Sequence, residues 1–263
     1  LADEHTTLLS LPFEEGDVLL RMNYFGLRSR RSNREIPVPV IEDHTHDLIG
    51  DWAKNSDADW CIASLRKTLP LAEGGFLWST KGMKLQILPV LTSENVLLAS
   101  KRWRAMRTKS LYLNDEIEDK QSFRNDMLLT EDQFDDMKVS AIDDESLDYI
   151  KHFEVVQWYI QKQFNRKILM ESLNCNNAIT VLEPESVGCN PFSVTMLFVT
   201  PAERDFYRES LIQHSVYPAI LWKVPESKNY SVVDFSERML SIHCDARYCR
   251  EEIMQLDKII AGR

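Results

Sequence analysis

Lys67 and Asp43 are the residues whose types and positions best suit a chemical reaction. Each follows a short apolar run, the first ending at Ala63 and the second at Ile41. A lysine amine can act as nucleophile and base, and a carboxylate can keep a ring nitrogen protonated. An acid at the end of one strand and a lysine at the end of the next suit the cofactor pyridoxal phosphate. The spacing therefore predicts a site for that cofactor.

Neighbouring side chains could complete such a site. Ser64 lies three residues before Lys67 and is placed to bind the phosphate group, which hydroxyls and backbone N–H groups commonly hold. His46 could reach the ring oxygen, whereas His44 could simply support the loop. Arg66 could neutralise the phosphate or point away as a surface charge, and the sequence leaves both interpretations open.

The first hundred residues alternate short apolar runs with polar connections. Four runs predict strands, and a short helical piece is expected at 48–55. Continuous apolar runs of four or five residues are typical of strands buried on both faces of an α/β sheet. Polar residues gathered after these runs fit ligand binding beyond the strand ends. The expected strands are 18–22, 38–41, 60–63 and 76–79.

The rest of the chain predicts helices and then a second, smaller domain. A long helix is expected within 89–107, and apolar residues at helical spacing predict another over 146–173. We expect three parts: 1–110 as half of a large cofactor-binding domain, 111–148 as an acidic linker or helical segment, and 149–263 as a small α+β domain. In this last part strands are expected at 178–182, 193–199, 216–221 and 239–242, with helices at 203–213 and 250–260.

Composition excludes several classes of function. The 263 residues carry a net charge of −10, which argues against a nucleic-acid surface. The one basic stretch, 28–34, could meet an anion but is better explained as a solvated loop. No apolar run approaches the roughly 20 residues of a membrane span, and no signal peptide is recognised. Five scattered cysteines suit reduced thiols in the cytosol. The start at Leu1, without methionine, suggests a processed or trimmed chain.

Several segments together resemble one family. Residues 67–75, with a lysine followed by Glu-Gly-Gly, are similar to the Schiff-base lysine segment of the DegT/DnrJ-type aminotransferases. Residues 41–43 resemble the family's Ile-Glu-Asp segment, which carries the ring-nitrogen aspartate. Residues 23–26 resemble its aromatic-glycine turn, and 239–248 resemble its closing strand. The matches cover roughly 16–82 and 189–260.

The resemblance implies a fold type I enzyme, α/β with a partial large domain of mainly parallel sheet and a small α+β domain. It implies a pyridoxal phosphate-dependent aminotransferase in which Lys67 forms the Schiff base, with Asp43, His46 and Ser64 also binding the cofactor. It further implies a homodimer, an amino-acid donor and a keto acceptor, such as a keto sugar. Asn23, Arg238 and Arg247 are candidate substrate contacts, and an arginine can hold a carboxylate through two hydrogen bonds.

Some features depart from the family pattern and keep alternatives open. His44-Thr45-His46 replaces the family's small residues and glutamine. A front stretch of the family, carrying the phosphate turn and the residue that stacks on the ring, is not seen here. A non-catalytic relative, or another pyridoxal phosphate chemistry such as a lyase or dehydratase, therefore remains an alternative. A cofactor-free Rossmann-like enzyme is disfavoured because no glycine-rich phosphate fingerprint is present.

Overall fold

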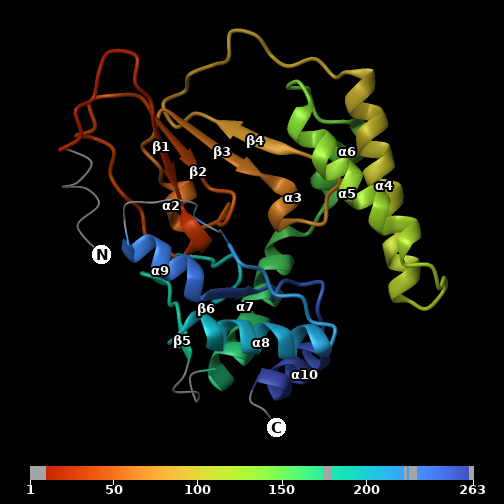
Figure 1. The fold of residues 1–263 in the computed structure, drawn as a ribbon. Coiled ribbons are helices and arrows are strands. Elements are labelled where there is room, and N and C mark those ends of the chain that lie inside the picture. The colour runs from red at the N-terminus through yellow and green to blue at the C-terminus, as the bar shows by residue number, and fades with distance from the viewer. Residues whose placement is uncertain (1–9, 174–178, 222–223, 225–229, 261–263) are drawn as a thin grey trace. The chain divides into compact units, whose positions relative to one another are not determined.

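The computed structural model of the chain describes residues 10–173, 179–221, 224 and 230–260 (Figure 1). These residues form two compact units. The first contains residues up to Met22, Arg31–Leu48 and Ser56–Phe153. The second contains Asn23–Arg30, Ile49–Asn55 and the residues from Glu154 onward. The three-part division at 110 and 148 stays a prediction, because compactness within one chain does not show which parts fold alone.

The first unit is built on a four-stranded sheet. Its strands are β1 (Leu19–Met22), β2 (Val40–Asp43), β3 (Trp60–Ser64) and β4 (Gly75–Trp78), in the spatial order β1-β2-β3-β4. The first three are parallel and β4 is antiparallel to β3. All four strands lie where the apolar runs predicted them, within two residues at each end. The expected α/β class with a mainly parallel sheet is confirmed.

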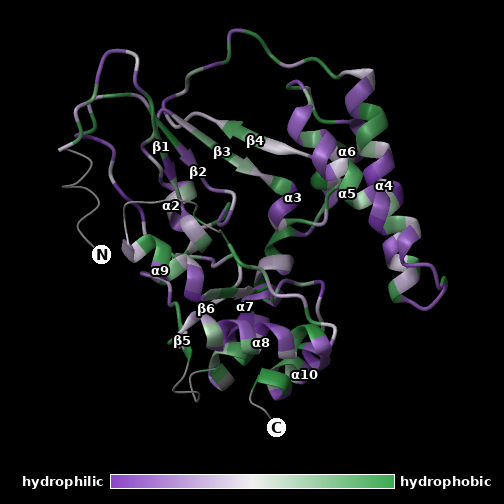
Figure 2. Ribbon diagram, viewed as in Figure 1, coloured by the Kyte–Doolittle hydropathy of each residue, from purple (hydrophilic) through white to green (hydrophobic). Residues whose placement is uncertain are grey.

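The two faces of this sheet differ in burial. Arg21, Glu42, Cys61 and Trp78 are register partners in one row across the four strands, and the first three are buried. On the opposite face, Leu20 and Leu77 are 54% and 45% exposed, and β4 is partly green in Figure 2. The expectation of burial on both faces is therefore wrong for these strands. Apolar runs report a strand's preference for packing, and they do not show whether a second layer covers it.

Four helices complete the first unit: α3 (Leu65–Thr68), α4 (Ser93–Leu113), α5 (Gln121–Asp136) and α6 (Asp144–His152). The Thr92 hydroxyl caps α4 and the Asp143 carboxylate caps α6, as hydroxyl and carboxylate side chains commonly do at helix starts. α5 lies beside α4 (Figure 1), where Arg102 donates to the Met127 carbonyl oxygen. Residues 121–136 thus pack as a helix of this unit.

The second unit combines a three-stranded antiparallel sheet with helices. The sheet contains β5 (Ile179–Val181), β6 (Val194–Phe198) and β7 (Met239–Ile242) in that order. Buried residues of these strands form a core with Leu169 of α7 (Val155–Leu173), Leu211 of α8 (Pro201–Gln213) and Ile253 of α10 (Arg250–Ile260). The face of α8 that is visible in Figure 2 is largely hydrophilic, as expected for a helix that packs its other face on a core.

Two short pieces from early in the sequence belong to the second unit. These are the 3₁₀ turn η1 (Tyr24–Gly26) and α2 (Asp51–Lys54). The Phe192 N–H donates to the Phe25 carbonyl at 2.8 Å, and the Asp51 N–H donates to the Gly188 carbonyl at 2.9 Å. Phe25 adopts a φ of 58°, a left-handed conformation that is uncommon outside glycine. Its buried ring packs in a cluster with Leu27 and Met239.

Some sequence expectations differ from the structure. The helix expected over 146–173 is two helices, because Phe153 is extended (φ −77°, ψ 126°) between α6 and α7. The strand expected at 216–221 is reduced to one bridge between Ala219 and Ser241. Helix α9 (Tyr230–Arg238) was not expected. Within the described residues, none of the helices is both long and apolar enough to cross a membrane.

Candidate functional site at the ends of β2 and β3

Asp43 and Ser64 end two neighbouring parallel strands. Asp43 is the last residue of β2 and pairs with Ile62 of β3, two residues before Ser64. Parallel strands carry their carboxyl ends to the same edge of a sheet, where open α/β folds bind ligands. Both side chains are half-buried. The structure therefore places these two predicted site residues at one edge of the sheet.

Thr45 joins the two strand ends, and sequence reasoning missed it. Its backbone N–H donates to Asp43 Oδ1 at 2.8 Å, and its hydroxyl oxygen accepts from the Ser64 N–H at 2.9 Å. An aspartate that accepts from the N–H two residues later is a recurrent turn motif. A hydroxyl residue two positions after a strand-ending aspartate is the signal that could have revealed it.

Lys67 lies in α3, directly after β3 (Figure 1). Its side chain is 50% exposed, and its Nζ lies 3.4 Å from Oε1 of Glu131 in α5. Glu131 also accepts from Arg66 at 2.5 Å and pairs with Arg102 at 3.3 Å. The hydrogen bond from Arg66, with the charges of all three cations, lowers the pKa of Glu131 to about 2. Sequence reasoning missed Glu131 because it lies in a distant segment taken for surface helix and linker.

The Arg66 side chain contacts two residues of α5. Besides its bond to Glu131, its guanidinium lies 5.1 Å from the ring centre of Phe134, within range of a cation–π interaction. Of the two interpretations that the sequence left open, the structure favours a structural charge over a phosphate ligand.

The segment that follows Lys67 closes on itself. The Leu65 N–H donates to the Gly74 carbonyl at 3.0 Å, and Ser64 pairs with Gly75 where β4 begins. Gly74 has a φ of 122°, which side-chain-bearing residues rarely adopt. A Cβ there would also come within 3.0 Å of the Ile142 side chain. The glycine that follows Glu73 is therefore needed for the shape of this loop.

Glu73 anchors the loop from inside. It is 6% exposed and accepts from the Asn95 amide at 2.8 Å and from the Asp143 N–H at 2.6 Å. Burial, with the neighbouring Asp143 side chain, raises the pKa of Glu73 to about 7. This glutamate connects the lysine segment to α4 and to the start of α6.

The two histidines after β2 have different surroundings. His46 is half-buried in the turn that follows the strand. His44 is fully buried, with its ring stacked on Trp78 at 5.8 Å between centroids and its Nε2 3.1 Å from Glu42 Oε2. His44 thus lies on the face of the sheet that carries Glu42.

The candidate substrate residues belong to the second unit. Arg238 binds both carboxylate oxygens of Asp234 and donates to the Phe198 carbonyl at 2.6 Å, while Arg247 binds both oxygens of Asp245. Asn23 is 2% exposed, and the described residues leave its Nδ2 without a hydrogen-bond partner. Both arginines already hold a carboxylate of this chain.

Comparisons with solved structures identify the fold. The aminotransferase TlmJ from Streptoalloteichus hindustanus matches with a TM-score of 0.58 at 11% sequence identity. The match covers 94% of this chain and 65% of the TlmJ chain. A DegT DnrJ EryC1 StrS aminotransferase from Brucella abortus matches with a TM-score of 0.53 at 14% sequence identity. This match covers 92% of this chain and 63% of the Brucella chain. The chain has the aminotransferase fold. Helicobacter pylori PseC, an aminotransferase involved in the biosynthesis of pseudoaminic acid, also has this fold, with a TM-score of 0.54 at 13% sequence identity. The match covers 92% of this chain and 65% of the PseC chain.

The likeness is one of fold and not of close sequence. No family model matches the chain, and no curated protein matches its sequence. The chain spans slightly less than two thirds of the length of the first two aminotransferases. The expected fold type I architecture is thus confirmed.

The side chains at the strand ends fit the chemical needs of pyridoxal phosphate. Asp43 would offer a carboxylate to a ring nitrogen, Ser64 a hydroxyl to phosphate, and Lys67 an amine to the aldehyde carbon. The amine is held by Glu131 in this structure, so that ion pair must open before Lys67 can react.

Proposed function

We propose that this chain is part of a pyridoxal phosphate-dependent aminotransferase in which Lys67 carries the cofactor. One observation carries the proposal. Asp43 and Ser64 end adjacent parallel strands and are bridged by Thr45, and Lys67 follows Ser64 by three residues. The aminotransferase fold of the chain supports it.

Each residue has a distinct role in this proposal. When bound, the cofactor supplies the electron sink that makes a proton on the substrate's α-carbon acidic. The Asp43 carboxylate holds a proton at the ring nitrogen, and the Ser64 hydroxyl binds a phosphate oxygen. His46 orients the ring through its oxygen. The Lys67 amine, once released from Glu131, acts as the base that moves the substrate proton.

The reactants are proposed by class. An amino-acid donor and a keto acceptor follow from the reaction, and a keto sugar is favoured because another matching structure, DesI, is described with its TDP-sugar product. Asn23, Arg238 and Arg247 stay candidate substrate contacts, and either arginine would have to leave its aspartate to bind a carboxylate. We further propose a homodimer, in keeping with enzymes of this fold.

The test is the visible absorption spectrum with pyridoxal phosphate, followed by borohydride reduction and peptide mass mapping. We expect an absorption band and a pyridoxyl adduct on Lys67, both lost in Lys67→Ala. Lys81→Ala is a matched control, because Lys81 also pairs with an acid and is 51% exposed, against 50% for Lys67. Product analysis with a donor and a keto acceptor then separates transamination from lyase or dehydratase chemistry.

A non-catalytic relative of the same fold is the second candidate. The observation that favours it is the exposed Lys67–Glu131 ion pair, which gives the lysine a purely structural partner. Absence of the band, or an adduct equally spread over Lys67 and Lys81, would support this candidate and refute the first.

A further inference from the structure

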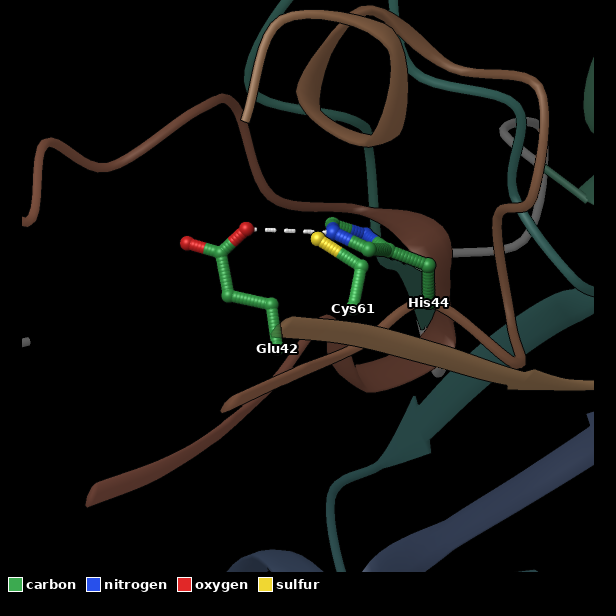
Figure 3. Close-up of side chains that lie close together, drawn as sticks. All are labelled: Glu42, His44 and Cys61. Carbon is green, nitrogen blue, oxygen red and sulfur yellow. Dashed lines mark hydrogen bonds and ion pairs between the residues drawn. The ribbon is translucent and has the colours of Figure 1, made fainter. Parts of the chain in front are cut away.

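Three buried side chains of different chemistry converge on one face of the first sheet (Figure 3). Glu42 and Cys61 are register partners on β2 and β3, and His44 lies two residues after Glu42 on the same face. All three are 0% exposed, and their potential ligand atoms lie within 4.8 Å of one another. Glu42 and Cys61 are held on paired strands, which are more rigid than loops. His44 follows the end of β2, where its N–H donates to the Ile62 carbonyl at 2.8 Å.

We propose that Glu42, His44 and Cys61 form a binding site for a borderline-soft divalent metal ion of the zinc class. Zn²⁺ accepts carboxylate oxygen, imidazole nitrogen and thiolate sulfur together, whereas Ca²⁺ and Mg²⁺ prefer oxygen alone. Bonds of about 2.0–2.3 Å in a tetrahedron place ligand atoms roughly 3.5 Å apart. The His44 Nε2 to Glu42 Oε2 distance is already 3.1 Å, so small side-chain movements suffice.

Charge favours an ion of this valence. One carboxylate, one thiolate and one neutral imidazole together balance the charge of a divalent cation. The buried Arg21, the register partner of Glu42, adds one positive charge beside them. Cysteine binds such an ion as the thiolate, so the metal must displace the thiol proton. The S–Zn bond forms as that proton leaves to solvent, and binding therefore strengthens as pH rises.

Further residues already orient the ligands. The Asn33 amide donates to Glu42 Oε1 at 2.7 Å, and the Trp78 ring stacks on His44. Ser56 donates to Glu42 Oε2 at 2.6 Å and accepts from the Cys61 thiol at 3.2 Å. Partners of this kind orient ligands and tune metal affinity. Ser56 is also close enough to offer a fourth ligand oxygen.

Asn33 lies between the cluster and a surface cavity. This residue lines a surface cavity of about 350 Å³, together with Asp57 and Asp59. Asn33 itself donates to both Asp57 and Glu42. Arg34 and Lys81 also line the cavity, and Lys81 pairs with Asp59, so its acidic and basic side chains balance.

The competing explanation is a hydrogen-bonded core cluster of Ser56, Glu42 and Cys61 that binds no metal. Titration of the full chain with Co²⁺ distinguishes the two, because a cobalt–thiolate bond gives a near-ultraviolet charge-transfer band. We expect one equivalent of Co²⁺, displaced by Zn²⁺, with tighter binding at pH 8 than at pH 6. The band should be lost in Cys61→Ser and His44→Gln and kept in Cys249→Ser, which changes an exposed thiol.

Absence of the band in the unmodified chain, or its persistence in Cys61→Ser, would overturn the proposal. If the variants do not fold, zinc X-ray absorption of the unmodified chain decides, with one sulfur among the bound atoms expected and none refuting the site. These readouts do not involve pyridoxal phosphate, so the metal site stands or falls independently of the proposed aminotransferase.

Discussion

Glu131 Oε1 lies 3.4 Å from the Nζ of Lys67, and the other oxygen of the same carboxylate binds Arg66 and Arg102. One anion thus faces three cations. A lysine amine must be free of such a partner before it can attack an electrophile. Glu131 therefore competes with any electrophile for the Lys67 amine.

Replacing Glu131 should make Lys67 more reactive. In Glu131→Gln the carboxylate is gone, so the ion pair that holds the Lys67 side chain is lost. We expect a few-fold faster formation of the borohydride-fixed pyridoxyl adduct on Lys67 at pH 7, followed by mass spectrometry. Asp132→Asn, an exposed neighbour on α5, should leave the rate unchanged. An unchanged rate in Glu131→Gln would show that the ion pair does not restrain the lysine.

Asp43→Asn should separate cofactor attachment from turnover. The amide oxygen can still accept from Thr45, so the fold and the adduct on Lys67 should persist. The ring nitrogen would lose its charged partner, and a charge-assisted hydrogen bond of about 1.5–3 kcal/mol corresponds to roughly ten- to a hundredfold in rate. We expect that loss in the rate of amino transfer, measured beside the thermal unfolding midpoint. Full activity in the variant would exclude Asp43 as the ring-nitrogen partner.

Glu73 should make stability depend on pH. Its folded pKa of about 7 lies above the unfolded value of 4.5, so the folded state holds the extra proton between these limits. Stability therefore falls as pH rises from 4.5 to 7, by up to about 3 kcal/mol. Urea unfolding of Glu73→Gln should lack this slope, whereas Glu118→Gln, at an exposed position, should keep it. Equal slopes in all three proteins would mean that Glu73 titrates normally.

The start of α8 offers a local test of stability. Thr200 accepts from the Glu203 N–H at 3.2 Å, and the Glu203 carboxylate accepts from the Thr200 N–H at 3.0 Å. Thr200→Ala removes one half of this capping box and should cost about 1 kcal/mol in free energy of unfolding. Glu209→Gln, exposed on the same helix, should change little. A cost well under 0.5 kcal/mol would show that the helix end frays in the native state.

The strands of the first sheet could be predicted because each is a short apolar run followed by polar residues. Asp43, Ser64 and Lys67 could be placed near strand ends for the same reason. The direction of the Lys67 side chain could not, since its partner Glu131 is brought near only by the packing of α5. The break at Phe153 also has no local signal, because no proline or glycine marks it.

The buried cluster beneath β2 shows another limit. Glu42 and Cys61 look unrelated in the sequence, and only the parallel register makes them neighbours. The sequence allows His44 to be loop support, whereas its ring lies in the same cluster (Figure 3). Alternation along a strand predicts which residues share a face, but the partner on the next strand depends on the register.

The closed loop from Leu65 to Gly74 has a consequence for how such a site can change over time. Its two ends are joined by a hydrogen bond, and Leu69 and Leu71 within it are buried. It is a loop inserted between β3 and β4. Descendant sequences could change residues within this loop while the pairing of the two strands stayed the same, provided that Glu73 kept its bonds to Asn95 and Asp143. The residues that determine the chemistry and the strands that maintain the fold thus lie in different parts of one short segment.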